Sequence, residues 1–441
     1  MLALETLLLA LAGIYLIYRV SKSTTFRLNW PTWFETCLMR GLIGVALARL
    51  LAMGLRRWET LAALGMTLVY GMVYRNSGYA FLIFLAILTV GFIGIDHRKI
   101  FRMYLLTVGV FYAVTLLAGL MGVITNYVTT RAGRGVRSAW GMSYYTDFAS
   151  LGLFILMAVW VACRKLPDWT MLLLCAGFAF LSAHIAHSNT STLCVGLLSC
   201  AIVWHGFERR VLDRKPKLGW MKKGPEFFAL FGFPLLALAM FALMLMYARG
   251  TGIGYRLNTL LSNRLLRSVE AWKSYGLKPF GTPFAQHGAG FSTFPSNIYN
   301  FVDSTYPLVL LRYGWVTLLM LCLSWGLTAQ RARRCGDRRL QLVMGIIAVH
   351  AFSEHHFIDA HFNLLVTRPL AAYLPQAQGE AAKRSKVPVS QRNAVLAWTI
   401  TGLLLTVAAF FAAPMALSRL KTALELMHYG HGRHALRLIC V

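Results

Sequence analysis

The sequence predicts an all-α protein that crosses a membrane many times. Of its 441 residues, 57% are apolar and 14% are charged, and the mean hydropathy is +0.58. Apolar runs recur along the chain, and no polar stretch is long enough to form a soluble domain. A helix needs about 20 apolar residues to cross a bilayer, so we predict one transmembrane domain over residues 1–441 with about 12–13 membrane helices. This composition excludes an ordinary soluble enzyme.

The predicted membrane helices follow the apolar runs in order. The first run has no basic segment before it and no small-residue cleavage site, so we expect a membrane helix there and not a cleaved signal. The predicted spans cover roughly residues 2–18, 34–53, 60–75, 79–95, 103–125, 145–162, 169–187, 189–204, 226–247, 305–327, 340–353, 357–374 and 394–413.

The formal net charge of +28 is explained by membrane topology and does not indicate a nucleic-acid partner. Lys and Arg form short clusters between the apolar runs, which is typical of cytoplasmic loops. The three largest clusters lie at 209–223, 331–339 and 383–392. When the chain is oriented so that these clusters are cytoplasmic, segment 19–33 lies on the outside. This segment holds three basic residues, so its position violates the positive-inside rule.

The same orientation assigns a large external loop to residues 248–304 and a shorter external segment to 126–144. Within the loop, Asn263 to Tyr275 is predicted to be a helix that ends at a glycine. The tail 414–441 mixes basic and apolar residues, which predicts a helix lying at the membrane interface.

Membrane topology does not explain the arginines on the external side. They lie in two groups: Arg131, Arg134 and Arg137, then Arg249, Arg256, Arg264 and Arg267. A guanidinium group binds phosphate or pyrophosphate with two parallel hydrogen bonds. Two separated groups therefore favour an anion site, with contact to lipid headgroups as the alternative.

Few acidic residues are available, because the chain has only 16. Asp303 stands just before a predicted span and is either the N-cap of that helix or a general base at the mouth of a site. His287 lies in a glycine-rich part of the external loop and is a second candidate for chemistry.

No metal or nucleotide site is predicted. His184 and His187 are three residues apart but have no carboxylate nearby in the sequence, and the eight cysteines lack zinc-type spacing. The chain has no phosphate-binding glycine loop, no dinucleotide-binding glycines and no acidic pair to hold Mg²⁺ beside a nucleotide sugar. We therefore expect a lipid-borne phosphate compound as the donor and no cofactor.

Several short motifs of residues 130–370, taken in order, resemble the Wzy-type polymerases of O-antigen, capsular and extracellular polysaccharides, which form one superfamily with the O-antigen ligases. The motifs in the external loop and the next span are Leu261-Ser-Asn-Arg264, Glu270-Ala-Trp272, Tyr275-Gly276-Leu-Lys-Pro-Phe-Gly281, Asp303-Ser-Thr-Tyr306 and Leu311-Arg-Tyr-Gly314. Arg137-Ser-Ala-Trp-Gly141, Asn189-Thr-Ser-Thr, Glu354 and Asn363 resemble other parts of the family pattern. Ligases carry a histidine where this chain has Asp303, which favours a polymerase.

The resemblance implies a GT-C-like helix bundle in a bacterial cytoplasmic membrane, with an active site that faces outward. The reaction would move a growing glycan from undecaprenyl pyrophosphate to a sugar hydroxyl of the next lipid-linked repeat unit, without a metal. Membrane lipids, a flippase and chain-length regulators would be partners.

The resemblance also suggests a role for each candidate residue. Arg137 and Arg264 are expected to bind the diphosphate, with Arg134, Arg256 and Arg267 as further candidates. Asp303 is the expected base, with His287 and Glu270 in reserve, and Tyr306, Trp272, Glu354 and Asn363 are expected to bind substrate.

Three other functions stay open at this stage, one of them a scaffold subunit of an envelope-synthesis complex that has no activity of its own. An O-antigen ligase-type transferase is the alternative within the superfamily. A secondary transporter or flippase for a lipid-linked glycan is the alternative from another class, although the chain shows no matching halves and no paired broken spans.

Overall fold

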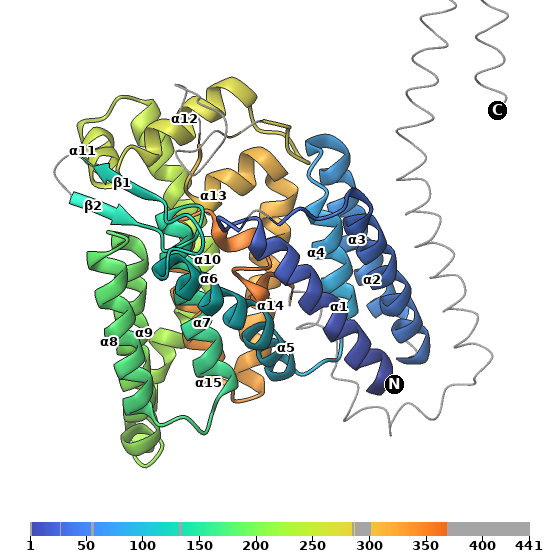
Figure 1. Cartoon of the computed structure of the whole chain (residues 1–441). Coiled ribbons are helices and arrows are strands. Elements are labelled where there is room, and N and C mark those ends of the chain that lie inside the picture. Colours follow the sequence, from blue (N-terminus) through green and yellow to red (C-terminus); the bar gives the residue numbers. More distant parts are fainter. Residues whose placement is uncertain are drawn as a thin grey trace, which may run out of the picture.

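The computed structural model describes residues 2–26, 28–53, 57–131, 135–284, 286 and 301–367. Most of the described chain is helical, as predicted, and the helices form one bundle (Figure 1). The predicted span 394–413, the predicted interfacial tail 414–441, and the candidates Arg134 and His287 lie outside the described residues.

The N-terminal part of the bundle is made of apolar helices that follow the predicted runs. These are α1 (Leu2–Ser21), α2 (Thr32–Met53), α3 (Arg57–Ser77), α4 (Phe81–Gly91), α5 (His97–Tyr104) and α6 (Val110–Leu120). A π-helical turn over Leu105–Gly109 joins α5 and α6 into one continuous helix. Asp96 caps α5 by accepting a hydrogen bond from the Arg98 backbone nitrogen, so the basic segment 96–102 is a helix start and not the predicted loop.

A small β-hairpin follows α6 and is not among the predicted elements. Strand β1 (Val128–Arg131) pairs with the antiparallel strand β2 (Gly135–Ser138), and Thr129 lies opposite Arg137. Strands β1 and β2 lie at the upper left of Figure 1. We name this upper end of the bundle the hairpin end, and the lower end the basic end.

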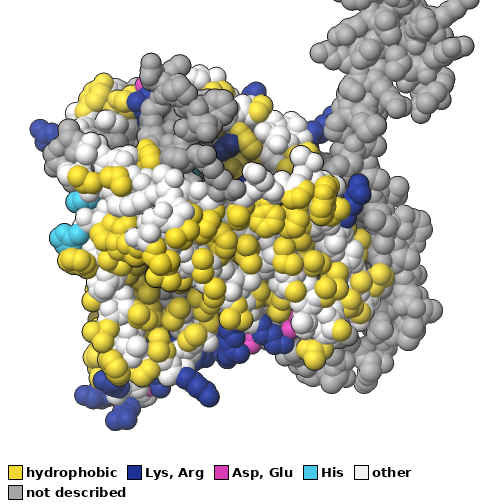
Figure 2. All heavy atoms as spheres, in the orientation of Figure 1, with side chains coloured by type: hydrophobic (Ala, Val, Ile, Leu, Met, Phe, Trp, Pro, Cys, Tyr) yellow, Lys and Arg dark blue, Asp and Glu magenta, His cyan; other side chains and the backbone are white. Residues whose placement is uncertain are grey.

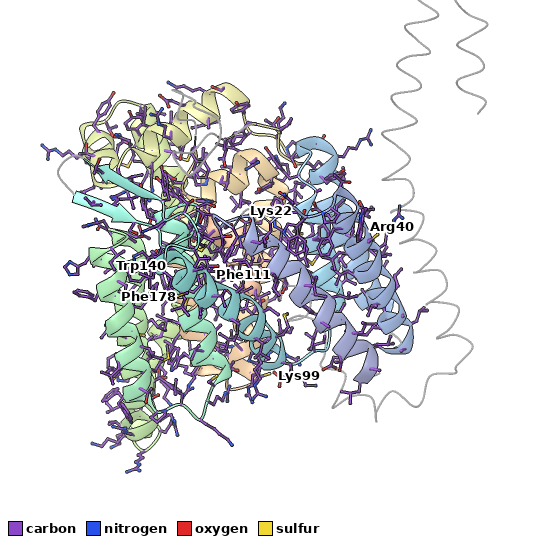
Figure 3. The ribbon with its side chains drawn as sticks, in the orientation of Figure 1. Lys22, Arg40, Lys99, Phe111, Trp140 and Phe178 are labelled. Atoms are coloured by element: carbon purple, nitrogen blue, oxygen red, sulfur yellow. The ribbon has the colours of Figure 1, made fainter. Side chains whose placement is uncertain are left out.

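The middle of the chain crosses between the two ends. Its elements are α7 (Tyr145–Ala162), α8 (Asp168–His184), α9 (Asn189–Phe207), a π turn at Glu208–Leu212, a 3₁₀ turn at Pro216–Lys222 and α10 (Lys223–Ala248). Figure 3 shows Phe178 of α8 and Trp140, which follows β2, at the same height. Phe148 of α7 contacts both rings, with centroids 5.8 Å and 5.6 Å away, and so ties the segment after β2 to the bundle.

The predicted external loop contains two short helices, α11 (Gly252–Leu260) and α12 (Arg264–Tyr275). The helix predicted from Asn263 to Tyr275 is thereby confirmed, and it ends at Gly276 with φ 69°.

The span predicted over 305–327 is broken. Helix α13 (Thr305–Leu308) continues as a π turn, Val309–Tyr313, and the chain turns at Gly314 before α14 (Trp315–Arg334). Helix α15 (Arg338–Ser353) then returns to the hairpin end. The next predicted span, 357–374, holds only the 3₁₀ turns His356–Ile358 and Leu364–Thr367 in its described part, and segment 354–367 is buried within the bundle.

Six helices of the described chain are long and apolar enough to cross a membrane. They are Leu2–Ser21, Thr32–Met53, His97–Leu120, Tyr145–Ala162, Asn189–Leu212 and Lys217–Ala248, and each lies on a predicted span. Figure 2 shows hydrophobic side chains across the middle of one face, with Lys and Arg side chains gathered at its lower edge. This distribution is that of a helical membrane protein.

Two of the three basic residues of segment 19–33 have protein partners, and the third, Arg27, lies outside the described residues. Arg19 forms an ion pair with Asp359 (3.6 Å), and Lys22 with Glu35 (3.8 Å). The segment also pairs with the chain after the hairpin, because the Thr25 backbone nitrogen donates to the Gly141 carbonyl at 2.8 Å. Tertiary pairing thus explains charges that the positive-inside rule does not.

Two glycines from separate family-like motifs interlock at the hairpin end. Gly281 (φ 75°) and Gly314 (φ 90°) both have left-handed backbones. A Cβ on Gly281 would lie 2.1 Å from the Arg312 carbonyl oxygen, and one on Gly314 would lie 2.2 Å from the Pro279 carbonyl oxygen. The Val316 backbone nitrogen donates to the Pro279 carbonyl at 3.1 Å, so the two segments share a backbone contact. Only glycine fits both positions.

We expect Gly281→Ala and Gly314→Ala each to destabilise the protein by more than about 2 kcal/mol, because the strained φ alone costs about 1–2 kcal/mol and the backbone clash adds to it. Gly177→Ala is the control, since a Cβ there meets no atom within 4 Å. Thermal unfolding in detergent would measure the difference. Equal midpoints for Gly314→Ala and Gly177→Ala would show that the contact is not rigid.

Candidate functional site

A polar cavity of about 460 Å³ opens at the hairpin end between β2, α7, α9, α12 and the end of α15. Five of the residues that the sequence singled out line it together: Arg137, Arg264, Arg267, Asp303 and Glu354. These residues come from four distant parts of the chain. The structure therefore gathers the two principal arginine candidates and the principal base candidate in one place.

Arg137 reaches the cavity from the hairpin. Strand β2 fixes its backbone, and its guanidinium stacks on the Tyr145 ring with 4.4 Å to the centroid. Only 2% of Arg137 is exposed, its Nε has no hydrogen-bond partner, and no carboxylate of the described chain pairs with it. A buried charge without a counter-charge is costly, so Arg137 favours an anionic ligand.

Arg264, the first residue of α12, faces a carboxylate. Its NH2 nitrogen lies 3.0 Å from Glu354 Oε1, and the exposed fractions of the two side chains are 18% and 4%. Burial raises the pKa of the Glu354 carboxyl to about 7, and the Arg264 guanidinium, which favours the ionised form, offsets this only in part. Glu354 can therefore gain or lose a proton near neutral pH.

Three helices start at the cavity and point their N-terminal ends toward it. Tyr145 begins α7, Asn189 begins α9 and Arg264 begins α12, and all three residues line the cavity. Ser188, the residue before α9, makes no side-chain cap, so the first backbone N–H groups of that helix are not capped by it. Helix N-termini carry partial positive charge and bind phosphate groups.

The backbone around the cavity is strained. His187, Ser262 and Asn263 line it and have positive φ values of 47°, 54° and 65°. Among the described non-glycine residues, only Trp140 shares this property. Such strain is concentrated at functional sites, where the surrounding structure holds it in place.

Asp303 lines the cavity and adds negative charge near Glu354. The N-cap of α13 is Ser304, so the capping alternative for Asp303 is wrong. The Thr305 hydroxyl donates to the Glu354 carbonyl at 2.5 Å, which fixes the start of α13 against the end of α15.

The other predicted residues of the described chain lie outside the cavity. Glu270 is at the surface and pairs with Arg267 (3.0 Å), and Arg256 is exposed on α11. Trp272 packs on Phe241, with ring centroids 5.7 Å apart.

Tyr306 and Asn363 are buried and organise the fold. The Tyr306 hydroxyl donates to the Ala348 carbonyl (2.9 Å). Asn363 holds segment 354–367 by donating to the Phe357 carbonyl (2.9 Å) and accepting from the Leu365 backbone nitrogen (3.1 Å). Sequence analysis did not identify Tyr145 as a site residue. Its position shortly after the Arg137 motif was the one indication that the sequence offered.

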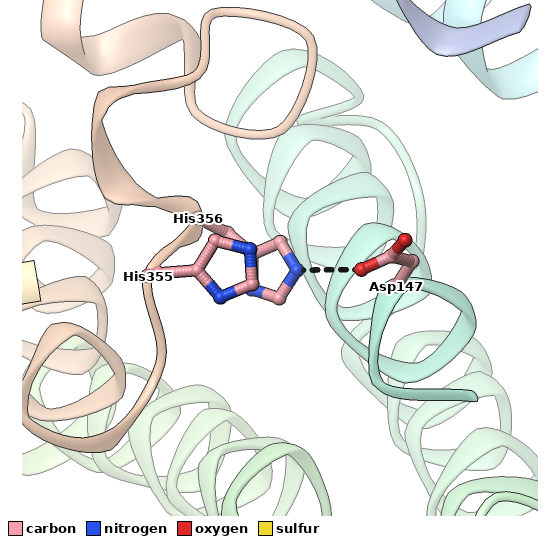
Figure 4. Close-up of side chains that lie close together, drawn as sticks. All are labelled: Asp147, His355 and His356. Carbon is pink, nitrogen blue, oxygen red and sulfur yellow. Dashed lines mark hydrogen bonds and ion pairs between the residues drawn. The ribbon is translucent and has the colours of Figure 1, made fainter. Parts of the chain in front are cut away.

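A second group of polar side chains lies next to the cavity (Figure 4). His356 Nε2 donates to Asp147 Oδ1 at 3.0 Å, and His356 Nδ1 lies 3.9 Å from Glu354 Oε2. His355 stacks on His356, with ring centroids 4.1 Å apart. The sequence did not connect these residues, because Asp147 lies far from both histidines along the chain.

The described chain is a helical membrane protein with a polar cavity at one end of its bundle, and three arginines and two carboxylates are among the residues that line it. In comparisons with known proteins, no family model, no curated protein and no solved structure matches the chain.

The raised pKa of Glu354 predicts a pH-dependent stability difference between the native chain and Glu354→Gln. The folded chain holds the Glu354 proton up to about pH 7, whereas the unfolded chain loses it near the ordinary value of 4.5. The native carboxyl is thus favourable at low pH, and its contribution is lost as pH rises through about 7. We expect similar unfolding midpoints at low pH, and a higher midpoint for Glu354→Gln above neutral pH.

Thermal unfolding in detergent across this pH range would check the expectation. A lower midpoint for Glu354→Gln in the alkaline range would mean that the attraction of Arg264 outweighs the effect of burial on Glu354.

Proposed function

We propose that the chain is a polysaccharide polymerase that elongates a glycan at the hairpin end of its bundle. The donor would be a growing glycan on undecaprenyl pyrophosphate, and the acceptor a sugar hydroxyl of the next lipid-linked repeat unit. The acceptor oxygen attacks the anomeric carbon, and the carbon–oxygen bond to the pyrophosphate breaks. The pyrophosphate leaves with the electron pair on its lipid, and the hydroxyl proton passes to a base.

The observation that carries the proposal is the buried Arg137 guanidinium, which has no counter-charge in the described chain and lies beside helix N-termini and Arg264. A pyrophosphate is a good leaving group once its negative charge is neutralised. Fixed guanidinium groups and helix N-termini can supply that neutralisation in a water-poor cavity, where electrostatic stabilisation is strong. The order of the family-like motifs supports the same reaction class.

Asp303 is the proposed base, because it lines the cavity with the arginines and is not the N-cap of α13. Glu354 has a different role in this proposal. Its pair with Arg264 orients the guanidinium toward the cavity, in the way that a carboxylate positions a catalytic cation. Direct displacement with a single base implies inversion at the anomeric carbon.

The proposed setting is the cytoplasmic membrane of a bacterium, with the hairpin end outward. The dense Lys and Arg clusters between α9 and α10 and between α14 and α15 lie at the opposite end, which agrees with the positive-inside rule. A flippase that delivers the repeat unit and a protein that limits chain length are the proposed partners.

Reconstituted protein with a purified lipid-linked repeat unit, and without added metal or nucleotide, should give a ladder of products. We expect Arg137→Ala and Arg264→Lys each to lower the initial rate by about 10²-fold or more, because the loss of one charge-stabilising fork costs that much. Arg249→Ala, an exposed arginine that does not line the cavity, is the control. An unchanged ladder for both cavity variants would contradict the proposed anion site.

Asp303→Asn should lower the rate by about 10²–10⁴-fold and leave binding of the lipid-linked unit in place, because only proton transfer is removed. Asp213→Asn at the basic end is the matched control. A variant with full activity would remove Asp303 as the base. Transfer of glycan to a lipid acceptor in a single step would indicate a ligase, and movement of the unit across vesicles without transfer would indicate a transporter.

A further inference from the structure

Three side chains beside the cavity combine the features of a metal site. Asp147 in the first turn of α7 and the adjacent His355 and His356 after α15 each offer one ligand atom, and these atoms all lie within 4.8 Å of one another. Figure 4 shows the two imidazole rings facing the carboxylate from the opposite segment. We propose that Asp147, His355 and His356 bind one divalent metal ion, with zinc as the ion that best fits this ligand set.

The ligand chemistry suits zinc. Imidazole nitrogen and carboxylate oxygen bind Zn²⁺ at about 2.0–2.2 Å, and three such ligands with one open position are a common arrangement. Ligands at those distances in a tetrahedron are separated by about 3.3 Å. The 3.0 Å between His356 Nε2 and Asp147 Oδ1 is close to this value, and rotation of the His355 ring would close the rest.

Burial and missing partners favour a ligand at this place. His356 is fully buried, and the Nδ1 atom of His355 is buried without a hydrogen-bond partner in the described chain. Each such atom costs free energy unless something satisfies it. A metal ion would replace the proton that His356 now shares with Asp147 and would give the His355 ring a partner.

A further carboxylate lies near His356, but it does not form a hydrogen bond with the ring. Glu354 Oε2 is 3.9 Å from His356 Nδ1, on the side of the ring away from Asp147. Asp147 and Glu354 together also balance the charge of the ion against the nearby Arg264.

The ion would tie α7 to segment 354–367, which are also joined here by the Asp147–His356 hydrogen bond. Because Glu354 begins that segment and pairs with Arg264, the ion would fix the floor of the cavity. This role is separate from the proposed phosphate chemistry, which depends on arginines.

Metal content of the purified full-length chain tests the site. Protein without an affinity tag, loaded with zinc and dialysed, should keep about one zinc per chain by mass spectrometry of the metal. Asp147→Asn and His355→Gln should lose it, while His184→Gln, which removes an exposed histidine of α8, should keep it. His355→Gln is the more informative variant, because it leaves the Asp147–His356 hydrogen bond intact.

A second readout does not depend on stoichiometry. Zinc should raise the unfolding temperature of the native chain and of His184→Gln in a saturable manner, and should not raise that of His355→Gln. The proposal is overturned if the native chain keeps no zinc after dialysis, or if His355→Gln keeps as much as the native chain. Glycan transfer is not measured in either experiment, so the outcome is independent of the proposed polymerase activity.

Discussion

The ion pair between Arg264 and Glu354 joins the segment above the bundle to the end of α15, and the cavity depends on this contact. Glu354 is almost fully buried, and its backbone carbonyl also accepts a hydrogen bond from Thr305. One residue therefore holds α12, α13 and α15 in place. Because burial disfavours the ionised carboxylate of Glu354, the strength of this contact depends on the protonation state of that carboxyl. The shape of the cavity therefore depends on how α12, α13 and α15 are held together at the hairpin end.

The other charged residues at the hairpin end are also subject to the cost of removing charge from water. A charged side chain at the edge of a membrane must pair with an opposite charge, contact water or bind a ligand. Arg19 and Lys22 are paired with carboxylates, and Arg267 is partly paired with Glu270. Arg137 is the described arginine of this end for which burial is nearly complete and no carboxylate is present. Arg137 thus differs from the paired arginines of this end, and this difference supports the proposed anion site.

Periodicity and motif order predicted much of this arrangement, because both depend on residues that are close in sequence. The apolar runs identified the spans from α1 to α10, and the ordered motifs identified Arg137, Arg264, Asp303 and Glu354 as candidates. Three features could not be found in this way. The hairpin is short and has no strand-like alternation; the break at Gly314 depends on a backbone contact with Pro279; and the roles of Tyr306 and Asn363 depend on distant carbonyls.

The pairing of Arg19 with Asp359 sets a time order for assembly. Arg19 leaves the ribosome before its partner, which follows about 340 residues later, and this takes roughly 20–70 s at typical rates of synthesis. During that interval the end of α1 must keep its charge in water or among lipid headgroups. Helix α1 can therefore form this ion pair only long after it has been synthesised, and chains that stall before Asp359 would lack the contact.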